Sequence, residues 1–350
     1  MKIAIDAGAL AQKQGARFGT YTFSDNIIRA FLRYGPKDVQ ARLYAQSRLS
    51  SLPHAHIPHQ TFVTQPFLGW MQTHVLLREL LHPSDTFLAL NQAFPAIYRG
   101  NIITFSHGLS FLKYPDMYPD HRRLMRQLDM MVARAHTIFV TAKRVQRELK
   151  AYAPRATVKL LPVGVPHDMV KKQRHARKKA FLFVGMKHKI KNIEGLLEAF
   201  SAVRKTPRGR DWELWIVGSG HSSRGHGVRV WKRPTREQLR KLYAQAGAYV
   251  CASHYESLHF PYLEALAQCA PIIGMKRNMI DEIQPFAHTC AKDIKSLEGG
   301  MLRFVSRPTR IRSTHKLHKT FDWSMSAQAI TSSITKAGSK HSFFPAHWYN

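Results

Sequence analysis

Short hydrophobic runs alternate with segments of helical periodicity along most of the chain. The runs lie at 2–6, 102–106, 137–141, 181–185, 214–218, 248–253 and 271–274. Apolar runs of this length that are each followed by a helix are typical of parallel strands buried on both faces. The pattern therefore predicts an α/β fold built from two similar halves.

Helices are predicted where apolar residues recur every three or four positions. Ile193, Leu196, Leu197 and Phe200 line one face of a helix over 193–200. Further helices are expected over 21–31, 122–135, 236–246, 261–269 and 280–286, with a last one from about Ser324. The basic segment 303–319 is predicted to be irregular.

A polar and basic segment without periodicity, 165–179, separates the two halves and is interpreted as an interdomain linker. Ligands of open parallel sheets bind beyond the carboxyl ends of the strands. The loops expected to face a cleft between the halves therefore follow Asp6, Ser106, Gly185, Gly218, Ser253 and Gly274.

The net charge of the chain indicates what kinds of partner it could bind. The 350 residues include 53 Lys and Arg against 22 Asp and Glu, a formal net charge of +31. Such a field attracts phosphates, nucleic acid and acidic lipid headgroups. No nucleic-acid-binding motif accompanies the charge, and the cations are scattered over both halves, so nucleic acid is the least favoured of these partners. A basic nucleic-acid-binding protein remains an alternative.

Cysteine usage and the N-terminus bear on location. The three cysteines form no CxxC pair, which favours a reducing compartment. The opening MKIAIDAGAL is not typical of a signal peptide, and no apolar stretch approaches 18 residues. We expect a cytoplasmic protein that can still attach to a membrane surface.

The strongest chemical signal is a pair of acids around a predicted helix start. Glu256 and Glu264 are eight positions apart, and Pro261 between them suits the first turn of a helix. Both carboxylates could then point into the space above a strand end and accept hydrogen bonds from sugar hydroxyls. On spacing alone, a solvated acid and an acid that favours the helix dipole explain the pair better.

The order of several motifs changes that weighting. FLFVGMKHKIKNIEGLLEAF, WELWIVGSG, YESLHFPYLEALAQCAPIIG and FDWSMSA, together with ITFSHGLSFLKYPDMYP in the first half, resemble the family 4 retaining glycosyltransferases of GT-B fold. The resemblance covers residues 1–327. It implies two Rossmann-like domains with parallel sheets that face each other across a cleft. The predicted divisions are 1–165 for the acceptor side, 166–179 for the linker, 180–322 for the nucleotide-sugar domain, and 323–350 for a helix returning to the first domain and a tail.

The resemblance also implies residue roles. Glu256 would hold hydroxyls of the donor sugar, Glu264 would bind the ribose, and Lys191 would grip the diphosphate in place of a metal ion. His107 would contact a sugar hydroxyl or position the backbone. The chain has no DxD motif, so no metal site is predicted. The remaining donor-binding residues would be Gly185, Lys187, Lys189, Phe260, Pro261, Gly15 and Gly19.

Three positions depart from the family pattern. Met186 stands where the family has an arginine, so Lys187 or Lys189 would have to substitute for it. His259 stands where glycine is usual, and Gly108 stands where an aspartate follows the family histidine. These changes bear on donor choice and on the strength of the activity.

The resemblance implies an enzyme that moves a hexose from a nucleotide-diphosphate sugar to a glycan or lipid-linked acceptor, with retention and without further cofactor. A GT-B-like protein that binds the sugar nucleotide without turnover is a second alternative. The predicted helix after His121 surrounds its apolar residues with arginines. It fits an anionic membrane surface or a core-facing helix with a solvated basic side, and both interpretations stay open.

Overall fold

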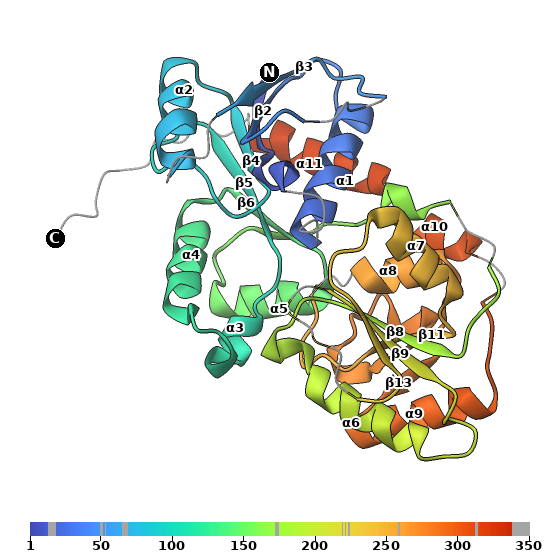
Figure 1. Ribbon diagram of the computed structural model, residues 1–350. Helices are drawn as coiled ribbons and strands as arrows, with labels where there is room; N and C mark the ends of the chain where they lie inside the picture. Colours follow the sequence, from blue (N-terminus) through green and yellow to red (C-terminus); the bar gives the residue numbers. More distant parts are fainter. Residues whose placement is uncertain are drawn as a thin grey trace.

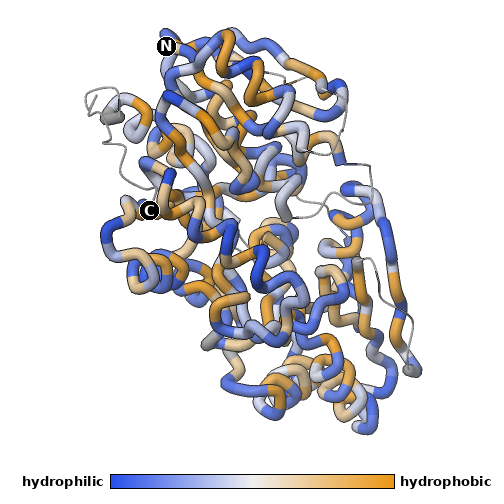
Figure 2. Tube along the Cα trace, turned by 90° about the vertical axis from the view of Figure 1, so that its left-hand side faces the viewer, coloured by the Kyte–Doolittle hydropathy of each residue, from blue (hydrophilic) through white to orange (hydrophobic). Residues whose placement is uncertain are grey.

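The computed structural model describes residues 1–12, 19–49, 52, 54–64, 69–171, 175–218, 220, 222, 225–257, 260–311 and 314–337. In this part of the chain the strands form two parallel sheets, and helices cover both faces of each (Figure 1). The predicted α/β class is confirmed. Hydrophobic and hydrophilic segments alternate through both halves (Figure 2).

The first sheet has the strand order β3-β2-β1-β4-β5-β6-β7. Its strands are β1 (Lys2–Asp6), β2 (Gln40–Ala45), β3 (His59–Val63), β4 (Thr86–Ala89), β5 (Asn101–Ser106), β6 (Thr137–Val140) and β7 (Val158–Leu160). In β1, Ile3 and Ile5 face the core cluster of helix α1, whereas Ala4 faces the opposite cluster with Val75. This alternation explains why a buried parallel strand reads as a continuous apolar run.

The second sheet has the order β10-β9-β8-β11-β12-β13. Its strands are β8 (Ala180–Val184), β9 (Glu213–Val217), β10 (Val228–Trp231), β11 (Ala248–Cys251), β12 (Ile272–Met275) and β13 (Thr289–Ala291). Phe181 and Phe183 pack with Leu196 and Phe200 of helix α6, while Leu182 faces the other side. The predicted helical face of α6 is therefore the buried one, with Leu197 half-buried at its edge.

The helices that cover the sheets differ in length. The α-helices are α1 (Gly19–Tyr34), α2 (Leu76–Leu81), α3 (Ser110–Lys113), α4 (His121–Arg134), α5 (Lys143–Tyr152), α6 (Ile193–Arg204), α7 (Arg236–Gln245), α8 (Phe260–Ala267), α9 (Ile294–Ser306), α10 (His315–Thr320) and α11 (Trp323–Ala337). Shorter turns of helix include η2 (Met71–Val75), η4 (His167–Met169), η5 (Lys189–Lys191), η6 (Lys276–Asn278) and η7 (Gln284–Phe286). Within the described ranges, no helix is both long and apolar enough to cross a bilayer.

Two secondary-structure predictions are wrong. The helix expected over 280–286 is a run of turns with the single 3-10 turn η7, because Pro285 cannot donate a helical hydrogen bond and disfavours helix in the residue before it. The segment 303–319 is more regular than predicted, since α9 extends to Ser306 and α10 begins at His315.

Helix α4 packs its apolar residues against the first domain. Leu128 and Met131 are buried in the core, and Leu124 is half-buried against it, whereas Met130 is exposed. Of the two interpretations of this helix, the core-facing one is confirmed. The apolar face is therefore not available to insert into a membrane.

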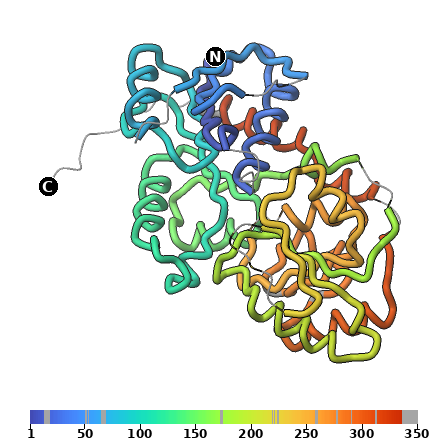
Figure 3. Tube along the Cα trace, in the orientation of Figure 1, coloured from blue at the N-terminus to red at the C-terminus, as the bar shows by residue number. Residues whose placement is uncertain are grey.

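The last helix returns to the first sheet. Helix α11 packs along α1, and Lys159 of β7 donates to the Ser333 hydroxyl at 2.8 Å. The Trp323 ring lies against Gly164, where a Cβ would come within 2.3 Å of the indole. Figure 3 shows the red C-terminal helix beside the blue N-terminal one. The domain divisions stay a prediction. They agree with the return of α11 to the first sheet and with the change of sheet between β7, which ends at Leu160, and β8, which begins at Ala180.

Candidate functional site

Lys191 and Glu256 form an ion pair at the carboxyl ends of two neighbouring strands. Lys191 ends η5, which follows β8, and Glu256 lies in the loop after β11, the strand paired with β8. The lysine Nζ is 2.8 Å from Oε1 and 3.0 Å from Oε2 of the carboxylate. Glu256 is only 4% exposed. The structure therefore brings two of the predicted catalytic residues together.

The surroundings keep Lys191 charged. Burial by itself would lower the pKa of the ammonium, but the adjacent Glu256 carboxylate more than offsets this, and the pKa is raised above its usual value. A fixed cation of this kind at a strand end suits an anionic ligand group.

Backbone and side-chain contacts hold the Lys191 loop against the Glu256 loop. Asn192 adopts a left-handed conformation with φ of 49°, and its amide donates to the Ala252 carbonyl at 3.3 Å. The backbone N–H of His254 donates to the Ile190 carbonyl at 2.8 Å. The His188 ring accepts from the backbone of Ile190 and caps the turn. The ion pair is thus placed by two loops that support each other.

Glycines line the same strand ends. A Cβ on Gly218, whose φ is 146°, would lie 2.0 Å from the Gly185 carbonyl oxygen, so the two loops meet backbone to backbone. The stem of Lys191 passes Gly185, and Lys187 lies beside Gly220. Lys187 and Lys189 are both exposed, in keeping with the predicted role of cations near a diphosphate. That role stays a prediction.

Glu264 has different partners. It lies on α8, is 3% exposed, and accepts from Tyr243 Oη at 2.8 Å, while Arg236 Nη1 of α7 lies 2.8 Å from its other oxygen. Arg236 also binds Asp168 of the linker through Nε at 2.5 Å and Nη2 at 2.8 Å. Glu256 and Glu264 therefore have different ion-pair partners, and the expectation that both point into one space stays a prediction. The ribose role of Glu264 remains a prediction.

This network is electrostatically tight. Burial and the Glu264 carboxylate raise the pKa of the Tyr243 hydroxyl well above its usual value. Burial would lower the pKa of Arg236, but Glu264 and Asp168 raise it instead. The linker is thus anchored to the second domain at Asp168, a contact that its basic composition does not suggest.

Two of the predicted donor-binding residues, Phe260 and Pro261, are the first two residues of helix α8. Pro261 is the second helical residue, where its missing N–H leaves no intrahelical partner unsatisfied. The ring of Phe260 is buried and lies 6.2 Å from the Trp323 ring. The Phe260 side chain therefore packs in the core, and its predicted part in donor binding stays a prediction.

His107 lies across the interdomain boundary from Glu256. Its Nε2 is 2.8 Å from the Leu90 carbonyl, and its ring packs edge-on to Phe23 at 4.9 Å. Burial lowers the pKa of the imidazole. The His107 carbonyl accepts from the Ser257 hydroxyl at 2.5 Å. Of the two predicted roles, backbone positioning fits these contacts.

Gly108 explains one departure from the family pattern. Its φ is 121°, and a Cβ there would lie 2.8 Å from the Ser257 Cβ. An aspartate at this position would collide with the second domain in this arrangement of the two domains. A glycine lets the domains approach closely at the site.

Sequence reasoning missed the residues that cross between the domains. Tyr255 donates to Glu148 Oε2 at 2.5 Å and accepts from the backbone of Leu109 at 3.3 Å. Tyr114 donates to the His254 carbonyl at 3.3 Å. The sequence offered one signal for these contacts, since Tyr255 and Ser257 flank the candidate site residue Glu256.

Two predicted residues in the first domain receive little further support. Gly19 is the exposed first residue of α1, with open space around the position of a Cβ. Gly15 lies outside the described residues, as does His259, so neither prediction is tested. Among the described residues, no group of three or more His, Cys, Asp or Glu side chains is arranged to hold a metal ion.

Comparisons with known proteins agree with this geometry. The family described as "Glycosyl transferases group 1" matches residues 178–303, which hold the second sheet. O-antigen chain mannosyltransferase B from Escherichia coli is 26% identical over 262 residues, 62% of this chain and 67% of that protein.

Solved structures extend the likeness to the whole fold. Sucrose-phosphate synthase from Thermosynechococcus elongatus has a TM-score of 0.64 at 15% identity, over 97% of each chain. HepE from Anabaena, solved in complex with UDP and glucose, has a TM-score of 0.59 at 14% identity, also over 97% of each chain. The second domain thus carries the group 1 glycosyl transferase sequence pattern, the chain has the GT-B fold throughout, and the protein is a glycosyltransferase.

Proposed function

We propose that the protein transfers a hexose from a nucleotide-diphosphate sugar to a glycan or lipid-linked acceptor, with retention at the anomeric carbon and without a metal ion. The observation that carries this proposal is the buried Lys191–Glu256 pair at the ends of β8 and β11. The E. coli relative named as an O-antigen mannosyltransferase and the Anabaena structure that binds UDP and glucose support the choice of reactants.

Lys191 would act on the leaving group. As the bond from the anomeric carbon to the phosphate oxygen breaks, negative charge grows on the diphosphate, and a preorganised ammonium stabilises it. In the free protein Glu256 neutralises that ammonium. Arrival of the diphosphate would release Glu256 to bind hydroxyls of the donor sugar and to offset positive charge at the anomeric carbon.

The proton balance of this reaction needs no nucleophilic side chain. The acceptor oxygen forms the new bond to the anomeric carbon on the face from which the phosphate departs, and its proton passes to the departing phosphate oxygen. Nε2 of His107 is occupied by the Leu90 carbonyl, and the role assigned to His107 is to position the backbone against Ser257.

A panel of radiolabelled UDP- and GDP-hexoses tests the proposal. The wild-type protein should hydrolyse or transfer at least one sugar, with and without EDTA, and the product should keep the anomeric configuration by NMR. Glu256→Gln should abolish turnover, whereas Lys205→Ala, an exposed lysine after α6, should not. Full activity of Glu256→Gln would refute the site.

The same assay separates the alternatives. Nucleotide-sugar binding without turnover would identify a non-catalytic binder. Polynucleotide binding with a steep salt dependence, in the absence of any turnover, would favour the nucleic-acid-binding alternative that the charge of +31 suggests.

We also propose that the protein attaches to an anionic membrane on the cytoplasmic side. The exposed apolar residues that support this are on α2, where Leu77, Leu80 and Leu81 occupy one face and are 59%, 45% and 67% exposed. The fraction of protein that sediments with phosphatidylglycerol vesicles should be lower for Leu77→Ser/Leu80→Ser/Leu81→Ser than for the wild type. Equal binding to phosphatidylcholine vesicles would contradict the role of charge.

A further inference from the structure

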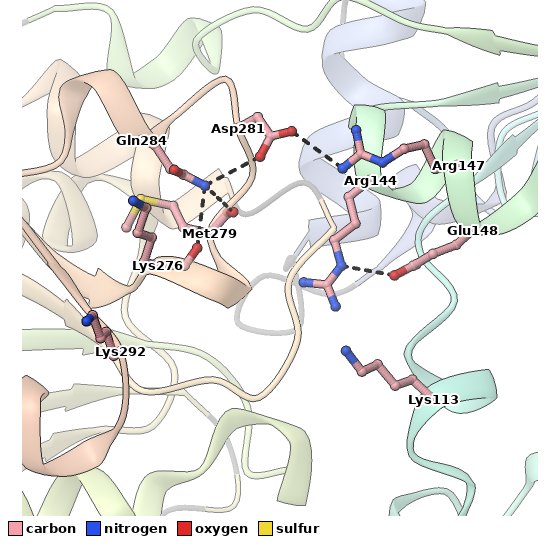
Figure 4. Close-up of a pocket in the computed structure, with 9 residues that line it drawn as sticks. All are labelled: Lys113, Arg144, Arg147, Glu148, Lys276, Met279, Asp281, Gln284 and Lys292. Carbon is pink, nitrogen blue, oxygen red and sulfur yellow. Dashed lines mark hydrogen bonds and ion pairs between the residues drawn. The ribbon is translucent and has the colours of Figure 1, made fainter.

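A cavity of about 600 Å³ lies between the two domains, apart from the Lys191 site. One wall comes from α3 and α5 of the first domain, and the other from the segments after β12 and β13 of the second (Figure 4). Its lining residues are Lys113, Arg144, Arg147, Glu148, Lys276, Met279, Asp281, Gln284 and Lys292.

The cavity is strongly basic. It presents five cationic residues and two carboxylates. Glu148 is held by Arg144 at 2.9 Å, and Asp281 is 3.6 Å from Arg147. Among the residues that the structure describes, Lys113, Lys276 and Lys292 have no carboxylate partner. Three ammonium groups therefore border this space with their charge uncompensated, and they repel one another.

The cavity is joined to the loop that carries Glu256. The Arg144 guanidinium lies 4.3 Å from the centre of the Tyr255 ring, and the Tyr255 hydroxyl donates to Glu148. On the other wall, the buried Asn278 amide donates to the Ser253 carbonyl at 2.7 Å. Both walls thus contact residues that shortly precede Glu256, so a ligand here would lie near the loop that carries Glu256.

The position excludes the donor diphosphate as the natural occupant. Lys191, Gly185 and Gly218 lie at the ends of β8 and β9, whereas the cavity lies at the ends of β12 and β13. These two strands form the opposite side of the sheet from β9 and β10. An anion bound here would therefore be distinct from the donor diphosphate.

We propose that this cavity binds a phosphate or diphosphate group of the acceptor. The inference rests on the proposed function and deepens it by naming the acceptor's chemical class. Phosphate oxygens accept charge-assisted hydrogen bonds from arginine and lysine together, and a multiply charged group matches a cavity lined by several cations better than one carboxylate does. Because both domains supply cations, the anion would also relieve their repulsion and favour domain closure.

Inorganic pyrophosphate is the first probe, titrated calorimetrically into protein saturated with a nucleoside diphosphate so that the donor site is filled. Lys276→Ala/Lys292→Ala should weaken pyrophosphate binding at least tenfold and leave nucleotide affinity within twofold. The charge-matched control Lys150→Ala/Lys205→Ala removes two exposed lysines elsewhere and should bind pyrophosphate as the wild type does.

The source of the phosphate is distinguished by competition. Displacement of pyrophosphate by farnesyl diphosphate, and not by a hexose phosphate, would indicate a lipid-linked acceptor, and the reverse would indicate a phosphorylated glycan. Wild-type pyrophosphate affinity in Lys276→Ala/Lys292→Ala, or an equal loss in the control, would overturn the proposal. Failure of the proposed function would appear separately, as absence of nucleotide-sugar turnover by the wild type.

Discussion

The Lys191 ammonium contacts both carboxylate oxygens of Glu256, at 2.8 and 3.0 Å, although the residues are 65 positions apart in the chain. The pair is largely buried, with the glutamate side chain 5% and the lysine side chain 20% exposed. Removing one partner of such a pair leaves an uncompensated charge in a poorly solvated place. The Lys191–Glu256 contact therefore stabilises the free protein, and it is also the contact that the proposed donor would replace.

Lys191→Met should lower the free energy of unfolding by about 3 kcal/mol, because the Glu256 carboxylate stays buried without its cation. Turnover should fall by about 10²–10³-fold, the usual loss for one preorganised electrostatic contact. Lys191→Met/Glu256→Gln should regain most of the stability and none of the activity. Urea unfolding and initial rates measure the two effects, and a double variant no more stable than the single one would contradict the pairing.

Arg236→Met should also destabilise the protein by about 3 kcal/mol, since it leaves Glu264 and Asp168 without their shared cation. The matched control is Lys241→Ala on the same helix, whose i,i+4 pair with Glu237 is half or more exposed and is worth about 0.3–0.5 kcal/mol. Equal urea midpoints for the two variants would show that the Asp168–Arg236–Glu264 network does not anchor the linker.

Gly108→Ala should impair the approach of the two domains. The alanine must adopt a φ of 121°, which costs about 1–3 kcal/mol, and its Cβ would collide with Ser257. We expect kcat/KM to fall at least tenfold and the radius of gyration in X-ray scattering to rise. Gly100→Ala, a glycine whose Cβ would meet the backbone of Ser84 and Asp85 within the first domain, controls for instability alone. It should not change the scattering of the folded protein.

Acidification should destabilise the protein through His107, which packs between the Leu90 carbonyl and the Phe23 ring. Burial lowers the pKa of His107 below the usual 6.5. The unfolded chain therefore binds more protons than the folded one below pH 6.5, so this stability is complete above that pH and is lost as the pH falls. This one histidine contributes at most about 1.4 kcal/mol per pH unit.

Urea unfolding at pH 7.5 and pH 5.5 measures this loss. His107→Gln can still donate to the Leu90 carbonyl but does not titrate, so it should reduce the difference between the two pH values. A wild-type protein that becomes more stable at pH 5.5 would contradict the assignment.

Much of the fold and part of the site followed from sequence pattern. Continuous apolar runs identified β1, β5, β6, β8, β9, β11 and β12, because a strand buried on both faces has no polar side. Shorter or more polar strands such as β3 and β13 lack that signal. Pro261 located the start of α8, and Pro285 removed a helix that the apolar residues around it had suggested.

Local periodicity in the sequence predicted the fold class and placed Glu256 after a strand, because short apolar runs followed by helices are visible along the chain. The resemblance to a known family added the returning helix and the part of Lys191. The tertiary structure decided which charges meet. Only the pairing of β8 with β11 brings Lys191 to Glu256, and only the packing of α7 on α8 turns Glu264 toward Arg236. The basic interdomain cavity could not be predicted from either half of the sequence, since its lining residues come from both domains.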